Sequence, residues 1–427
     1  MGEIILIEGG RVIDPANGID SVLTVVLRDG RVAELREHVE RPREARAIDA
    51  RGKWVVPGFI DLHAHLREPG QEYKETIESA GRAAAAGGFT TVCAMPNTCP
   101  PNDNASVTQL ILSRATAGTV RVHPVGCISR GQKGEELAEY GELKMAGCVA
   151  VSDDGRPVMS SMLMRRALEY ARAFDLPVAV HEDDLVLAGK GVMNEGPVST
   201  RLGLAGAPAA CEEVMVLRDI ALAELTGGRL HLAHLSCAGS VRAVREAKRR
   251  GLAVTAEVTP HHLTLTDEHL ARSDYNTSFK MSPPLRSAAD VLAVRQGLAD
   301  GTIDCIATDH APHSLVEKEV EFDEAANGVV GLETAFSVCL SLVRERVLTE
   351  KRFIEALTVG AAKAFLLEGG TLSKGARADL AVLDPELRWR CEPEHFRSKG
   401  RNSPWKGEAL VGRCTHTIVD GRFVHEL

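Results

Sequence analysis

The sequence predicts an α/β protein, a (β/α)8 TIM barrel with a small β-sandwich domain formed by both chain ends. From Phe59 onward, short β-rich runs alternate with helical patterns, an order typical of parallel strands joined by crossover helices. The two ends of the chain instead show short alternating strands separated by turns. We therefore expect residues 57–369 to form the barrel, and residues 1–56 plus 370–427 to form one composite sandwich.

Eight runs in the central segment have the apolar character of buried strands. They are 59–65, 90–95, 120–126, 148–154, 177–182, 230–236, 253–258 and 304–310. Amphipathic helical stretches lie between them, among them 72–86, 161–174, 240–250 and 287–299. In such a barrel the active site lies at the C-terminal ends of the strands, so residues at these ends are the candidates for function.

The chain ends have the strand-turn-strand character of a small β domain. It is clearest in IILIEGGRVID and SVLTVVLRDGRVAEL near the start, and in 378–384 and 416–427. Neither end has enough strands to fold alone. We therefore expect them to combine, with junctions near Pro57-Gly58 and Gly369-Gly370.

The composition excludes several classes of function. A net charge of −9 gives no broad attraction for nucleic acid or for anionic membranes. No apolar run approaches the roughly 20 residues that span a bilayer, and the first residues lack the basic-then-apolar order of a signal peptide. The ten cysteines form no CxxC pair, which argues against a zinc ribbon or a disulfide framework. We expect a cytoplasmic protein with reduced cysteines.

The strongest local signal is the pair His63 and His65 in FIDLHAHLREPG. Residues i and i+2 of a strand point to one face, so both imidazoles can bind one metal ion. Taken alone, the pair is explained as well by two partly solvated histidines at a strand end.

Four further residues strengthen the metal hypothesis because each ends another predicted strand. They are Asp153, His181, His234 and Asp309. Taken alone, each residue is explained as well by a structural role, as a capping aspartate or a hydrogen-bonded histidine. A barrel would bring all of them together, however, and a converging set of histidines and carboxylates favours a metal site.

Three neighbouring residues are alternatives to these candidates. Asp154 competes with Asp153, and the spacing leaves that choice open. His231 lies on the face opposite His234 and nearer the start of its strand, so we assign it to packing. His310 follows Asp309 and is expected to point away from the barrel axis.

At this point the chain resembles the amidohydrolase superfamily and, within it, bacterial dihydroorotases whose metal bridge is an aspartate. The motifs that carry the resemblance are HAHLREPG (63–70), GGFTTVCAMPNT (87–98), SDDG (152–155), HED (181–183), LAHLS (232–236), EVTPHH (257–262), PPLR (283–286) and ATDHAPH (307–313). The resemblance implies two zinc ions per chain. It places His63, His65 and Asp309 on one ion and His181 and His234 on the other, with Asp153 as the bridge.

The resemblance also implies an activity, the interconversion of N-carbamoyl-aspartate and dihydroorotate in pyrimidine synthesis. Asp309 would carry the proton between the attacking water and the leaving ring nitrogen. Arg67 is the expected partner of the substrate carboxylate, because a guanidinium binds carboxylates in bidentate fashion. The alternative role for Arg67 is a surface salt bridge with Glu68 or Glu72. The other expected substrate contacts are His65, Asn97, Ser282, His313, Asn327 and Gly328.

Two positions depart from the family pattern. Ser282 stands where these enzymes usually have the Asn of MNPPLR, and Asn327 where they usually have the Phe of a Phe-Gly pair. Both changes put substrate affinity in doubt and leave the expected metal ligands intact. Residues 311–330 form a long polar connection, either a loop that closes over the substrate or a solvated surface loop.

Three other functions compete with this one. A hydantoinase or allantoinase would share the metals and mechanism but take another ring, which Arg67 and Asn97 disfavour. An inactive scaffold for aspartate transcarbamoylase would typically have lost metal ligands, although an active chain could still dock to that partner. A plain binding module would not need ligands converging from five strands. A homodimer is expected from the resemblance only.

Overall fold

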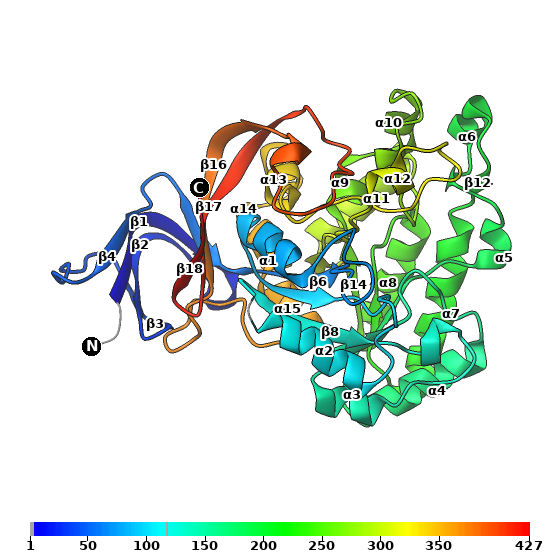
Figure 1. Ribbon diagram of the computed structural model, residues 1–427, viewed down its shortest axis with the longest axis horizontal. Helices are drawn as coiled ribbons and strands as arrows, with labels where there is room; N and C mark the ends of the chain where they lie inside the picture. The colour runs from blue at the N-terminus through cyan, green and yellow to red at the C-terminus, as the bar shows by residue number, and fades with distance from the viewer. Residues whose placement is uncertain (1–3, 117) are drawn as a thin grey trace.

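The computed structural model describes residues 4–116 and 118–427, and its larger part is a barrel of parallel strands (Figure 1). The strand order is β6-β7-β8-β9-β10-β13-β14-β15. Their bounds are β6 Phe59–Ala64, β7 Phe89–Ala94, β8 Arg121–Gly126, β9 Ala150–Ser152, β10 Val178–Val180, β13 Leu230–Leu232, β14 Val254–Val258 and β15 Cys305–Ile306. A bridge between Ala64 and His310 brings the last strand beside the first. The predicted barrel is confirmed, with one observed strand in each of the eight runs.

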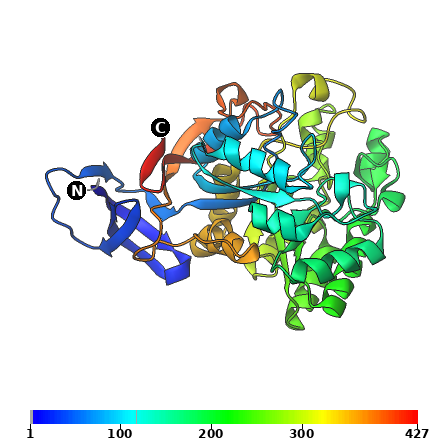
Figure 2. The ribbon, with the colours of Figure 1, turned by 60° about the horizontal axis from the view of Figure 1, so that its bottom comes forward.

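Helices cover the outside of the barrel, as the turned view in Figure 2 shows. The longer ones are α1 Ile77–Ala86, α2 Ala105–Ala115, α4 Ser161–Arg172, α7 Ala210–Thr226, α8 Ala238–Arg249, α11 Ala288–Ala299, α13 Ala335–Arg344 and α14 Glu350–Leu357. Their starts follow capping rules, since Thr76, Ser160 and Ser287 each accept a hydrogen bond from an amide of the first turn. Among the described residues, we find no helix with the length and apolar character that crossing a membrane requires.

Shorter elements fill the remaining connections. They are α3 Tyr140–Ala146, α5 Leu185–Ala188, β11 Met193–Asn194, α6 Pro197–Leu202, β12 Gly206–Ala207, α9 Pro260–Thr264, α10 Asp267–Ala271, α12 Leu315–Lys318 and α15 Val359–Ala364, with single 3-10 turns at 15–17, 130–132, 277–279 and 393–395.

The two chain ends share one mixed sheet at one end of the molecule, where both termini lie (Figure 1). Its strands are β1 Ile4–Asp14, β2 Ile19–Arg28, β3 Arg31–Arg36, β4 Arg46–Asp49, β5 Trp54–Pro57, β16 Leu380–Arg390, β17 Ala409–Val419 and β18 Arg422–Glu426. The ends join where β5 pairs antiparallel with β16, Pro57 opposite Leu380. The expectation that both ends build one β unit is confirmed, while the boundaries at 56/57 and 369/370 stay predictions.

The barrel strands alternate between two packed surfaces. Ile60, Leu62, Val125, Ala150 and Ala179 belong to a cluster inside the barrel, whereas their sequence neighbours pack between strands and helices. Because side chains alternate along a strand, this parity continues toward the ends of regular strands. It directs the residues that follow such strands either into the barrel mouth or toward the helices. β6 is an exception, since its register shifts between Asp61 and Ala64, and His63 and His65 lie at the barrel mouth although Ile60 and Leu62 have the opposite parity.

Candidate metal centre and pocket

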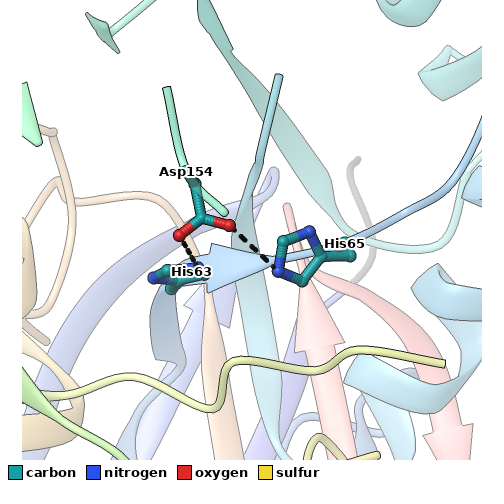
Figure 3. A group of neighbouring side chains, drawn as sticks. All are labelled: His63, His65 and Asp154. Atoms are coloured by element: carbon teal, nitrogen blue, oxygen red, sulfur yellow. Dashed lines mark ion pairs between the residues drawn. The ribbon is translucent and has the colours of Figure 1, made fainter. Parts of the chain in front are cut away.

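The mouth of the barrel brings together histidines and carboxylates from separate strands. Their ligand atoms form two overlapping sets, one of His63, His65 and Asp154 and the other of Asp154, His181 and His234, each within 4.8 Å. Figure 3 shows the Asp154 carboxylate between the two rings of the first set. Its Oδ1 lies 3.3 Å from His63 Nε2 and its Oδ2 lies 3.4 Å from His65 Nε2. Asp154 is therefore common to both sets.

Asp309, which follows β15, joins the first set. Its Oδ1 lies 3.0 Å from His65 Nε2 and 3.6 Å from His63 Nε2. On the other side, His181 Nδ1 and His234 Nε2 each lie 3.5 Å from Asp154 Oδ1. Five of the six residues expected as metal ligands thus lie in one buried cluster.

The sixth, Asp153, does not, and the expectation that it bridges the metals is wrong. Its carboxylate turns away and accepts hydrogen bonds from the Ile128 amide at 2.8 Å and from the amide and hydroxyl of Ser129. The reason is strand alternation. Ala150 and Asp154 share a parity that points into the barrel, whereas Val151 and Asp153 face the helices.

The cluster has the chemistry of a site for two divalent ions. His63 Nε2, Asp154 Oδ1 and His234 Nε2 are buried and have no hydrogen-bond partner among the residues the structure describes. Their spacings of 3.3–3.5 Å exceed the roughly 2.7–2.9 Å of a charge-assisted hydrogen bond. Metal ions bound to these nitrogen and oxygen atoms would satisfy all three. The donor set therefore fits a pair of metal ions.

The electrostatics of the cluster favour a cation in the same place. Burial raises the pKa of the Asp154 carboxyl, but His63, His181 and His234 outweigh it and hold that pKa well below its usual value. Burial lowers the pKa of His63, yet Asp154 and Glu257 raise it well above the ordinary value. Because the carboxylates stabilise positive charge at this point, a metal ion can take the place of the proton.

A cavity of about 330 Å³ opens over the cluster. It is lined by every residue expected to contact substrate, namely His65, Arg67, Asn97, Ser282, His313, Asn327 and Gly328. Arg67 is buried, its Nε donates to the Pro312 carbonyl at 3.2 Å, and its guanidinium lies 3.3 Å from His313 Nε2. Glu68 pairs with Arg114 instead. The guanidinium therefore belongs to the pocket wall, not to a surface salt bridge.

The segment 311–330 forms another wall of the cavity. Buried Lys318, at the end of α12, donates to the carbonyls of Ala326 at 2.7 Å and Gly328 at 3.2 Å. Gly328 has φ 130, and a Cβ there would lie 2.5 Å from the Cβ of Ala311, so only glycine fits. The structure thus shows the segment anchored against the barrel.

Sequence reasoning missed one residue in contact with the cluster, Glu257 in β14. Its Oε1 lies 2.7 Å from His63 Nδ1, and its Oε2 lies 3.1 Å from His231 Nε2. A lone charged residue in the apolar run AVTAEV was the available signal. His231, assigned to packing, is indeed buried but forms part of this polar contact. His310 faces Glu75 at 3.3 Å, outside the cluster as expected.

Comparison with known proteins decides the family. A family model described as dihydro-orotase-like matches residues 52–240, and one described as amidohydrolase family matches residues 209–425. The chain is 71% identical over 427 residues to a dihydroorotase of Anaeromyxobacter sp. (strain K), covering 100% of this chain and 99% of the relative. It is 53% identical to a dihydroorotase of Geotalea daltonii, covering 99% of each. The chain belongs to the dihydroorotase family.

Solved structures place this dihydroorotase family member on a fold that hydantoinases share. The L-hydantoinase (dihydropyrimidinase) from Arthrobacter aurescens matches with a TM-score of 0.90 at 26% identity, covering 100% of this chain and 96% of that one. The dihydropyrimidinase from Brevibacillus agri has a TM-score of 0.86 at 21% identity, covering 99% and 95%. The fold therefore does not distinguish among ring substrates, and the residues of the pocket must do so.

Proposed function

We propose that this chain catalyses the reversible cyclisation of N-carbamoyl-L-aspartate to (S)-dihydroorotate and water, with two zinc ions as cofactors. The observation that supports it most is the position of Arg67, Asn97 and His313 in one cavity with the two ligand sets. Cationic and amide donors beside a metal-binding cluster suit a cyclic amide that carries a carboxylate. The full-length identity to dihydroorotases supports the same substrate.

In this proposal His63, His65 and Asp309 would hold one zinc ion, His181 and His234 would hold the other, and Asp154 would be shared by both. When bound, the pair of ions would acidify a water molecule and polarise the ring carbonyl. Asn97 Oδ1 lies 2.8 Å from His65 Nδ1, so it accepts the Nδ1 proton and leaves Nε2 available to the metal. The Asn97 amide nitrogen donates to the Asp154 carbonyl at 3.5 Å and has a second proton for a substrate acceptor.

Asp309 is the proton carrier in this mechanism. In ring opening, the water oxygen bonds to the ring carbonyl carbon, the C–N bond breaks, and Asp309 transfers the water proton to the leaving nitrogen. In cyclisation, the ureido nitrogen attacks the side-chain carboxyl carbon and Asp309 carries its proton to the departing oxygen. The carboxylate is buried, and although burial raises its pKa, the charges of His63 and His65 lower it below the usual value. The carboxylate is therefore ionised at neutral pH.

Arg67 is the proposed partner of the substrate α-carboxylate, with His313 and Asn97 beside it. Ser282 Oγ lies 3.4 Å from His181 Nε2, so the serine that replaces the usual asparagine contacts a ligand ring as well as the cavity. The polar Asn327 offers a backbone carbonyl to His313 Nε2 at 2.8 Å. Through this hydrogen bond the loop residue fixes the imidazole beside Arg67.

The proposal also covers location and partners. All ten cysteines are free and nine are buried or part of the core, which supports a reducing, cytoplasmic setting. A homodimer, and docking to aspartate transcarbamoylase, rest on the family resemblance alone.

The deciding experiment assays zinc-loaded protein with dihydroorotate beside 5-substituted hydantoins and allantoin, with metal content measured on the same sample. We expect turnover of dihydroorotate with about two zinc ions per chain. Arg67→Met should abolish dihydroorotate turnover while keeping both ions, and Arg114→Met, an exposed change outside the cavity, should behave as the parent. Turnover of hydantoin alone would reject the substrate, and absence of bound metal would reject the mechanism.

A further inference from the structure

Beneath the metal-binding cluster lies a buried polar chain that the proposed mechanism does not use. Its centre is Glu257, which is only 1% exposed. One oxygen, Oε1, lies 2.7 Å from His63 Nδ1 and accepts a longer hydrogen bond of 3.4 Å from the His234 backbone amide. The other, Oε2, lies 3.1 Å from His231 Nε2. A single carboxylate thus contacts one residue from each of the two ligand sets.

The contacts fix where the protons lie. Glu257 as a carboxylate only accepts, so His63 must carry its proton on Nδ1 and His231 must carry one on Nε2. Nδ1 of His231 then accepts from the hydroxyl of Thr255, 2.8 Å away. Every hydrogen bond in the chain Thr255–His231–Glu257–His63 is satisfied in this arrangement. It leaves the lone pair of His63 Nε2, a buried atom without a hydrogen-bond partner in the described chain, directed at the metal site.

We propose that Glu257 is a positioning residue for the metal centre, held in place by His231, and that it fixes the tautomer and orientation of His63 while anchoring the backbone at His234. The proposal rests on the two-metal function above. A carboxylate behind a metal-ligating imidazole raises the basicity of the ligand and orients the ring, and the loss of such a partner typically costs about 10–100-fold in metal affinity. His234 gains from the same residue because its backbone at φ 32 is strained.

Charge supports the same role. Two divalent ions would bring four positive charges into a buried site, and Asp154 and Asp309 offset two of them. Glu257 adds a further buried negative charge directly behind a ligand ring.

The same residues could instead form a third metal site, because His231, Glu257 and Cys305 place ligand atoms within 4.8 Å of one another. Two observations argue against it. The Glu257 and His231 atoms already bond to each other, and burial raises the pKa of the Cys305 thiol well above its usual value. A protonated thiol is a poor ligand. The polar chain therefore serves the neighbouring site.

The test compares Glu257→Gln with a matched control, Asp61→Asn. Asp61 is as buried as Glu257 and lies two residues before His63, but its oxygens accept from the backbone amides of His63 and Thr308 and from the Thr308 hydroxyl. Both changes replace a buried carboxylate with an isosteric amide that keeps one acceptor oxygen. Only Glu257→Gln removes charge from behind a ligand imidazole.

The readouts are the affinities for Zn²⁺, measured by competition with a chromophoric chelator, and the visible spectrum of the Co²⁺-loaded proteins. We expect Glu257→Gln to weaken binding of at least one ion about tenfold or more and to shift the Co²⁺ spectrum, with Asp61→Asn within about twofold of the parent. His231→Gln, a second variant should Glu257→Gln not fold, should show a smaller loss in the same direction.

Two results would overturn the inference. One is a folded Glu257→Gln protein that binds Zn²⁺ as tightly as the parent and has an unchanged Co²⁺ spectrum. The other is a loss of Zn²⁺ affinity in Asp61→Asn equal to the loss in Glu257→Gln. In both cases a parent that binds two ions keeps the proposed function intact. A parent that binds no metal would remove the proposed function and this inference together.

Discussion

After three of the barrel strands, β6, β13 and β15, a residue with positive φ carries a side chain of the candidate site. His234, Asp309 and Arg67 all have positive φ, at 32, 46 and 62. His234 shares the parity of Leu232, which packs toward the helices, so an extended backbone would direct its ring away from the mouth. The left-handed turn brings the ring to Asp154 instead. Such strained backbone costs about 1–3 kcal/mol and is typical of functional sites.

Asp153 and Asp154 offer a matched test at this scale, because the two aspartates differ only in direction. Asp154→Asn should reduce bound zinc to one ion or fewer per chain and lower turnover about a hundredfold or more, since an amide is a poor bridging ligand. Asp153→Asn should keep both ions and near-parent turnover, because an amide oxygen can still accept from Ile128 and Ser129. Metal content after dialysis, measured with the assay, separates them. Equal losses would contradict the assignment of Asp154.

Glu333 makes a residue-level prediction about pH. Burial raises the pKa of its carboxyl to about 7 from 4.5, so the folded state holds this proton more tightly than the unfolded state. The stabilisation of the folded state by this proton is fully present below about pH 4.5. It is lost as pH rises to 7, because over this interval the unfolded state releases its proton first. Glu333→Gln should remove this loss of stability, because the glutamine oxygen can still accept hydrogen bonds from the backbone amides of Arg397 and Ser398.

Urea unfolding of parent and Glu333→Gln at pH 5 and pH 8 measures the effect. We expect the parent to lose about 1–3 kcal/mol more than the variant over this interval. Other titrating groups cancel in the comparison. Parallel pH profiles for the two proteins would show that Glu333 titrates normally.

At the scale of elements, the connections decide the shape of the pocket. α12 and the following residues are held by Lys318, whose buried ammonium satisfies carbonyls of the pocket wall. Lys318→Met keeps the size of the side chain and removes its donors, leaving buried acceptors that cost about 1–3 kcal/mol each. The wall at Asn327 and Gly328 should loosen. We expect KM for dihydroorotate to rise about tenfold, with kcat and zinc content near parent values.

Steady-state kinetics with metal analysis checks this prediction, and Lys351→Met, an exposed change on α14, is the control. A fall in kcat with unchanged KM would instead mean that the segment acts in the chemical step.

The longer regular elements could be predicted from the sequence because their hydrophobic period repeats often enough to be recognised. The elements in residues 185–207 could not, because α5, β11, α6 and β12 are two to six residues each and too short to show a period. Within the site, histidines at strand ends were recognisable, whereas Glu257 was not, because its role depends on a contact with β6 that only the closed barrel creates. Asp153 failed as a bridge for a similar reason, since direction depends on where β9 ends.

At the scale of the whole molecule, the barrel and the end sheet share a core. Trp54 and Val56 of β5, with Ala381 and Leu383 of β16, belong to the same apolar cluster as the barrel strands and their helices. The Trp54 ring packs edge-on against Phe336 of α13, with centroids 6.1 Å apart. Because the apolar contacts run across both parts, we expect them to unfold together.

Trp54→Ala tests this coupling. Removing a buried indole typically costs about 3–5 kcal/mol, and if the parts are coupled, the barrel helices should lose stability together with the end strands. Hydrogen exchange in urea, read by mass spectrometry on peptides from β1–β2 and from α4–α8, reports both parts at once. The two sets of peptides should share one urea midpoint in the parent, and both midpoints should shift together in the variant.

Val22→Ala in β2, at a side chain 63% exposed, is the control and should leave both midpoints unchanged. Barrel helices that kept the parent midpoint while the end strands opened early would show that the two parts fold independently.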